Sequence, residues 1–109
     1  MSAAREIGDR ATAHPEPPPV QVRIPGLLRS YTDGAERVAI PAAGNPPSLA
    51  DGLAALEARF PGLRFRVVDE QGQIRAHIKM FIDGTQARDL AAPLPPGGEL
   101  MIVGALSGG

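Results

Sequence analysis

Few side chains in this sequence have the type and spacing needed for covalent or metal chemistry. The absence of cysteine excludes disulfides, thiolate nucleophiles and cysteine-ligated metal sites. His14 lies in a proline-rich segment and His77 lies at a strand, so neither belongs to a recognisable set of metal ligands. Ser30, Ser48 and Ser107 have no histidine and acid partners at a recognisable spacing. We therefore expect neither a catalytic residue nor a metal site.

The C-terminal residues Ser107-Gly108-Gly109 offer chemistry of a different kind. Glycines lack a Cβ and approach another backbone closely, so these residues can thread a narrow channel into the active site of a partner. The terminal carboxylate of Gly109 is then the substrate. The alternative is a frayed end or a cloning remnant, because chain termini are often small and disordered.

Length and composition exclude several classes of function. A chain of 109 residues holds one small domain with little room for a deep cleft, so a large multi-substrate enzyme is excluded. Eleven basic and twelve acidic residues give a formal charge of −1, which argues against nucleic acid as a partner. The chain has no apolar run of roughly 20 residues and no signal-peptide pattern, so we expect no membrane association and a cytoplasmic location.

Residues 1–19 end in a run of prolines and are expected to form a disordered tail, because proline removes backbone donors and favours polyproline II. The P-x-x-P spacing of Pro15 and Pro18 leaves open a second interpretation, a ligand for a protein that binds proline-rich segments. We expect the folded domain to cover residues 20–106 and residues 107–109 to form a flexible tail.

Alternating apolar and polar residues predict the strands. The segments 20–24 and 35–40 alternate in this way around the turn Thr32-Asp33-Gly34, which predicts an N-terminal hairpin. The later expected elements are an extended piece over 63–68, a polar turn over 69–73, a strand over 78–82, a loop rich in Ala and Pro over 85–96, and a final apolar strand over 99–103.

One helix is expected between these two groups of strands. The Ser48 hydroxyl is a good N-cap, and Asp51 three residues later is a weaker version of the capping-box acid. The segment Pro61-Gly62 ends the helix. The apolar stripe that covers the sheet consists of Leu49, Leu53, Leu56 and Phe60.

This order of elements predicts an α+β protein in which one helix crosses one face of a mixed sheet, the order of a β-grasp fold. Over residues 20–109 the chain resembles the ubiquitin-like sulfur carriers of the MoaD/ThiS family. The segments that carry the resemblance are Phe60-Pro61-Gly62-Leu63, Phe81-Ile82-Asp83-Gly84, Pro96-Gly97-Gly98-Glu99 and the terminal Gly108-Gly109. The spacing is most similar to the longer cysteine-route and archaeal-type members. Gly104 replaces a proline of the common C-terminal motif, and Leu106-Ser107 replace Val-Ala.

The resemblance implies that the chain is a carried substrate rather than an enzyme. An adenylating enzyme of the ubiquitin-activating type would use ATP and magnesium to convert the Gly109 carboxylate to an acyl adenylate, and sulfur would then replace AMP. The resulting thiocarboxylate would donate sulfur to a synthase, with the molybdopterin and cysteine routes as the expected pathways. The chain itself is expected to bind no cofactor and to be a monomer when free.

Two other functions stay open. A ubiquitin-like protein modifier would use the same adenylate, but its Gly109 carboxylate would form an amide with lysines of other proteins. Lys79, the only lysine here, would be its sole internal acceptor. A pure binding module, by contrast, would keep its function after deletion of Gly108 and Gly109.

A docking surface is expected on the sheet face opposite the helix. If Leu100 and Ile102 face the helix, strand alternation sends their neighbours to the open face. An inverted register, or a second small core under the loop 85–96, would remove this surface. Its expected members are Phe81, Met101, Val103 and Leu106, rimmed by Arg23 and Lys79.

Overall fold

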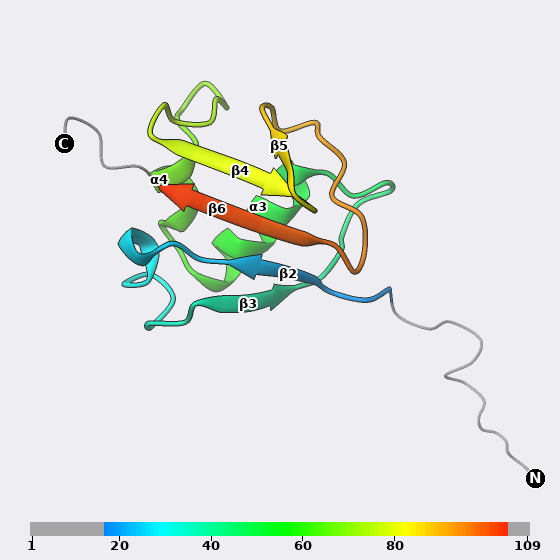
Figure 1. Cartoon of the computed structure of the whole chain (residues 1–109), viewed down its shortest axis with the longest axis horizontal. Helices are drawn as coiled ribbons and strands as arrows, with labels where there is room; N and C mark the ends of the chain where they lie inside the picture. Colours follow the sequence, from blue (N-terminus) through cyan, green and yellow to red (C-terminus); the bar gives the residue numbers. More distant parts are fainter. Residues whose placement is uncertain (1–16, 105–109) are drawn as a thin grey trace, which may run out of the picture.

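A computed structural model describes residues 17–104 of the chain. In this part, a five-stranded mixed sheet has the strand order β3-β2-β6-β4-β5, and the helix α3 lies across one of its faces (Figure 1). This is the arrangement that the α+β, β-grasp prediction requires. The elements are β2 (Val20–Arg23), the 3-10 helix η1 (Gly26–Leu28), β3 (Arg37–Ile40), α3 (Leu49–Arg59), α4 (Leu63–Val67), β4 (Ile78–Ile82), β5 (Thr85–Ala87) and β6 (Glu99–Gly104).

β2 and β3 form the antiparallel pair predicted for the N-terminal hairpin. Val20 lies opposite Ile40, and Val22 lies opposite Val38, with all four side chains buried. Between the strands the chain makes more than a tight turn, because η1 places Leu28 fully in the core. β2 also pairs in parallel with β6, so the C-terminal strand occupies the centre of the sheet.

The helix α3 begins as the sequence predicts. The Ser48 hydroxyl accepts a hydrogen bond from the Asp51 N–H (3.3 Å), and the Asp51 carboxylate accepts one from the Ser48 N–H (2.9 Å). The first N–H of the helix, at Leu49, donates to the carbonyl of Ala92 (2.8 Å), so a distant loop completes the capping. The predicted stripe faces the sheet, with Leu49, Leu53 and Leu56 fully buried and Phe60 half-buried.

The segment 63–68 was predicted as an extended piece, and this prediction is wrong: residues 63–67 form the short helix α4. An extended segment would place Leu63, Phe65 and Val67 on one face. In the helix, Leu63 and Val67 are four residues apart and fully buried, whereas Phe65 points away and is 54% exposed. The strand period of two and the helical period both bring Leu63 and Val67 to the same side. Only the position of Phe65 therefore distinguishes a strand from a helix here.

The carboxylate of Glu57, on α3, supports the start of α4. It accepts hydrogen bonds from the N–H groups of Gly62 (2.8 Å) and Arg64 (2.9 Å). These two hydrogen bonds lower the pKa of the Glu57 carboxyl below its ordinary value, and the bond from Gly62 has the larger effect. Gly62 itself has a φ of 95°, which glycine adopts without strain and which turns the chain from one helix into the next.

β5 is a second difference from the prediction, which placed a loop over 85–96. After the predicted turn at Asp83-Gly84, the short strand Thr85–Ala87 pairs with β4 at the edge of the sheet. Only Ala87 of its three residues is buried, so the strand has almost no alternation to detect. No helix within residues 17–104 combines the length and the apolar composition that crossing a membrane requires.

Candidate functional site

The end of β6 is the last described point before the residues predicted to react. β6 lies between β2 and β4, and its last residue, Gly104, is the partner of Ile78. Figure 1 shows this end of the strand beside η1 and α4. The residues predicted to dock, to thread into a partner and to be adenylated, Leu106, Ser107, Gly108 and Gly109, lie outside the described residues.

The register of β6 is the one predicted. Leu100 and Ile102 are buried beneath the sheet, whereas Val103 is 37% exposed and Met101 is half-buried on the other side. Phe81 of β4 is the cross-strand partner of Met101 and is also half-buried. We call Phe81, Met101 and Val103 the open-face patch.

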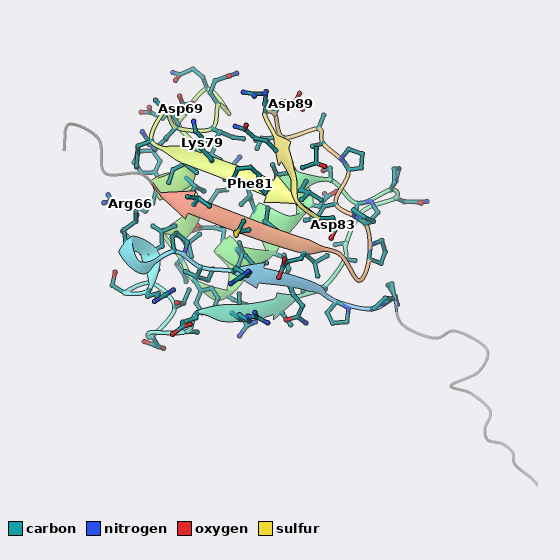
Figure 2. All side chains as sticks on the ribbon, viewed as in Figure 1. Arg66, Asp69, Lys79, Phe81, Asp83 and Asp89 are labelled. Carbon is teal, nitrogen blue, oxygen red and sulfur yellow. The ribbon has the colours of Figure 1, made fainter. Side chains whose placement is uncertain are left out.

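Two basic side chains flank the open-face patch, as the sequence predicts. Lys79 of β4 lies opposite Val103, and Arg23 of β2 lies opposite Met101, so the two cations approach β6 from opposite neighbours. Figure 2 shows Lys79 and Phe81 on the sheet face turned away from α3. The structure therefore brings the described members of the predicted docking surface together.

The loop after β5 does not form a second core over this patch. Leu94 is buried against α3, where a Cβ added at Gly52 would lie 2.5 Å from its Cδ2 atom. Leu90 and Ala92 also pack against the main core. The loop thus covers the end of α3 rather than the open-face patch.

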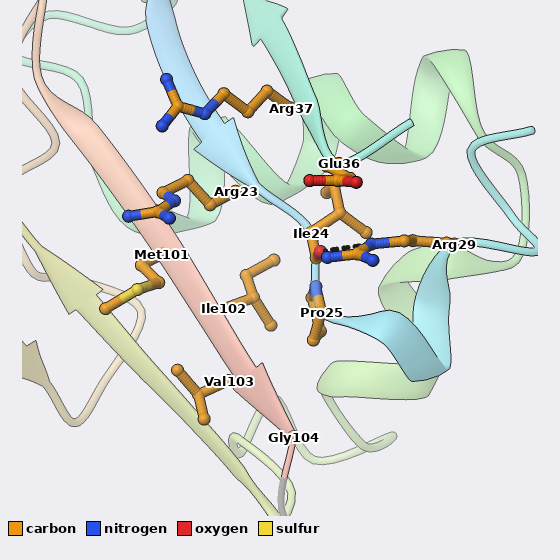
Figure 3. A pocket seen from close by; sticks show the side chains of 10 residues that line it. All are labelled: Arg23, Ile24, Pro25, Arg29, Glu36, Arg37, Met101, Ile102, Val103 and Gly104. Atoms are coloured by element: carbon orange, nitrogen blue, oxygen red, sulfur yellow. Dashed lines mark hydrogen bonds between the residues drawn. The ribbon is translucent and has the colours of Figure 1, made fainter. Parts of the chain in front are cut away.

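A pocket of about 320 Å³ adjoins the open-face patch at the end of β6 (Figure 3). Met101 and Val103 line it together with Arg23, Arg29 and Arg37, and among residues 17–104 Glu36 is the only carboxylate in the lining. Nε of Arg29 donates to the Ile24 carbonyl (3.1 Å), which holds that guanidinium at the pocket. The pocket thus combines apolar surface with positive charge, as an acidic partner requires.

Of these arginines, only Arg23 was singled out from the sequence. Arg29 belongs to the connection between β2 and β3, and Arg37 is the first residue of β3. No local pattern places either of them beside β6. His77 is half-buried and lines a different pocket, with Leu27 and Phe65. Among residues 17–104, no group of three or more His, Asp and Glu side chains is placed to hold a metal ion.

No family model and no curated protein matches this chain. Solved structures do match it. CysO of Amycolatopsis orientalis, from the BexX/CysO complex, is 27% identical with a TM-score of 0.71, covering 83% of this chain and 99% of that chain. Mycobacterium tuberculosis CysO, described as an antigen, is 25% identical with a TM-score of 0.69 over 80% of this chain and 99% of its own. SAMP1 of Haloferax volcanii is 26% identical with a TM-score of 0.70, covering 84% of this chain and 99% of that chain.

Each of these proteins is matched over almost its whole length, so the likeness covers a complete domain. This chain has a central C-terminal strand, a covering helix and the strand order of a β-grasp sheet. The predicted β-grasp fold is confirmed. The structural neighbours of this chain are ubiquitin-like sulfur carrier and modifier proteins of the MoaD/ThiS type, as its sequence motifs indicated.

Proposed function

We propose that this chain is a sulfur carrier. A partner enzyme joins the Gly109 carboxylate to AMP with release of pyrophosphate from ATP, and sulfide then displaces AMP to form a thiocarboxylate. The thiocarboxylate sulfur, ionised at neutral pH, is passed to a sulfur-accepting synthase of the molybdopterin or cysteine route. The observation that carries this proposal is the likeness to CysO and SAMP1 in a chain that ends in Gly108-Gly109.

In this proposal the folded domain positions the C-terminus and performs no bond chemistry. Pairing of β6 with both β2 and β4 gives the last residues a rigid base. The open-face patch, Arg23 and Lys79 orient the domain on its partner, so the carboxylate arrives at the nucleotide site in one direction. Such positioning lowers the entropic cost of the adenylation step. ATP and magnesium belong to the partner.

The intact mass of the protein tests the proposal. The full chain is incubated with ATP, magnesium, sulfide and the adenylating enzyme of its host, beside a variant that lacks Gly109. We expect a mass gain equal to sulfur replacing oxygen, localised to the C-terminal peptide and absent from the variant. An unchanged mass, with an enzyme shown to be active on another carrier, would contradict the proposal.

A second candidate is a ubiquitin-like modifier, favoured by the likeness to a protein named small archaeal modifier protein 1. Both functions begin with the same adenylate, so the fate of the carboxylate separates them. A modifier would leave Gly109 in amide linkage to lysines of other proteins, and tryptic peptides with a C-terminal remnant on lysine would reveal this. Lys79→Arg would remove any conjugate of the chain with itself through a lysine side chain.

The role of the open-face patch is tested by a matched pair of substitutions. Val103→Glu places a charge in the patch, and Ala54→Glu places the same charge at an exposed position on α3. We expect Val103→Glu to raise the KM of adenylation about tenfold, since a charge buried in an apolar contact remains unpaired. Ala54→Glu should leave the KM unchanged. Equal KM values for both variants would exclude the open-face patch as the docking surface.

A further inference from the structure

A second surface lies beside the end of β6, on the side of η1 and α4. Leu27, Phe65, Arg66, Arg75 and His77 line a pocket there of about 230 Å³, which we call the lateral pocket. Leu27 is 43% exposed and Phe65 is 54% exposed. Together with Val103 they are the large apolar side chains that stand exposed within residues 17–104. All three therefore gather around the end of one strand, which marks an interaction region.

The aromatic ring of the lateral pocket is held in place. Nε of Arg75 donates to the carbonyl of Phe65 (2.8 Å), and the guanidinium of Arg75 lies 4.6 Å from the centroid of the Phe65 ring. Arg75 comes from the segment before β4, so it fixes the ring from outside α4. An exposed ring that is already ordered loses little entropy when a partner covers it.

The lateral pocket also adjoins the base of the predicted reactive tail. A Cβ added at Gly104 would lie 2.1 Å from Cδ2 of Leu27, so the Leu27 side chain lies directly over this glycine. A partner that contacts Leu27 is therefore held next to the residue from which the C-terminal segment continues.

The charge of the lateral pocket defines its occupant. Arg66 and Arg75 line it, and no carboxylate of residues 17–104 does. Figure 2 shows Arg66 at the end of the molecule where β6 finishes. The lateral pocket thus combines apolar side chains with guanidinium groups. Its charge and polarity are complementary to a protein segment that carries an apolar side chain and neighbouring carboxylates.

We propose that the lateral pocket binds an acidic segment of the enzyme that adenylates Gly109. An apolar side chain of that segment enters between Leu27 and Phe65, and its carboxylates pair with Arg66 and the outer edge of Arg75. This inference rests on the proposed function, because it names the same enzyme. It adds a second contact, so that the enzyme holds the domain on both sides of β6.

Pyrophosphate exchange by the host adenylating enzyme, with the full chain as substrate, tests this proposal. Phe65→Ser removes the apolar wall, Arg66→Glu reverses one charge, and Arg88→Glu makes the same charge change after the edge strand β5. We expect Phe65→Ser and Arg66→Glu to raise the KM about tenfold with kcat unchanged, and Arg88→Glu to change neither. Thermal unfolding of each variant verifies that it folds, since all three positions are exposed.

Three results would overturn the proposal in distinguishable ways. A wild-type chain that is adenylated, with the KM of Phe65→Ser and Arg66→Glu unchanged, refutes the lateral pocket and leaves the carrier function intact. An effect confined to sulfur transfer to the synthase, or to self-association measured by light scattering, assigns the pocket to another occupant. A wild-type chain that the enzyme does not adenylate refutes the carrier function and this inference together.

Discussion

Glu57 connects the helix α3 to the start of α4. Its carboxylate accepts hydrogen bonds from the N–H groups of Gly62 and Arg64, so the ionised form is stabilised in the folded state. The pKa of this carboxyl is lower in the folded state than in the unfolded state. Its contribution to the free energy of unfolding is therefore fully present above the unfolded pKa of 4.5 and is lost as the pH falls through the folded pKa.

We therefore expect Glu57→Gln to lower the free energy of unfolding at neutral pH, with a difference from the wild type that shrinks as the pH is lowered. Urea denaturation of both proteins from about pH 7 down to about pH 3 measures this difference. A difference that stays constant over this range would show that the charge of Glu57 contributes nothing to the start of α4.

At the scale of elements, the start of α3 is stabilised by its own residues and by a distant loop. Ser48→Ala removes the hydroxyl that accepts the Asp51 N–H, and we expect a loss of about 1 kcal/mol in the free energy of unfolding. Urea denaturation measures the loss. The helix should persist, since the Leu49 N–H still donates to the Ala92 carbonyl. Ser30→Ala, at an exposed position outside any helix, is the control and should change stability by less than about 0.5 kcal/mol.

The elements were predictable to different degrees. β2, β4, β6 and α3 were all predicted, because each buries one face and so shows a clear period of two or of three to four. α4 and β5 were missed. α4 is one short helix whose first N–H groups are capped from another element, and β5 is a strand of three residues held by its pairing with β4.

At the scale of the whole molecule, positive charge gathers at one end. Arg23, Arg29 and Arg37 line the pocket beside the open-face patch, and Arg66 and Arg75 line the lateral pocket. Figure 2 shows Asp83 and Asp89 toward the other end of the sheet, and Asp69 at the same end as Arg66. A formal charge of −1 therefore conceals a local cluster of positive charge around these two pockets, which would steer an acidic partner toward this end.

This local cluster of positive charge predicts that salt slows association with an acidic partner. Raising the ionic strength from about 0.05 M to 0.5 M should lower the association rate constant with the adenylating enzyme, because salt screens the steering field. Stopped-flow fluorescence at several salt concentrations measures the slope. Arg37→Glu should reduce that slope and Arg88→Glu should change it less. An association rate that is independent of salt would show that the positive cluster has no part in recognition.

The candidate site was foreseen in part for the same physical reason as the fold. Phe81, Met101, Val103, Arg23 and Lys79 lie where strand alternation places them, since neighbouring residues in one strand must point to opposite faces. The roles predicted for Leu106, Ser107, Gly108 and Gly109 depend on motifs, and these residues lie outside the described part of the chain.

Local sequence was sufficient for the α+β order, the capping box at Ser48 and the open face of the sheet, because periodicity and turn residues act between near neighbours. Long-range packing was needed to bring Leu27, Phe65 and Gly104 together at the end of β6. These three residues come from η1, α4 and β6. No pattern within one of these segments predicts their contact, because its free energy depends on how all three elements pack.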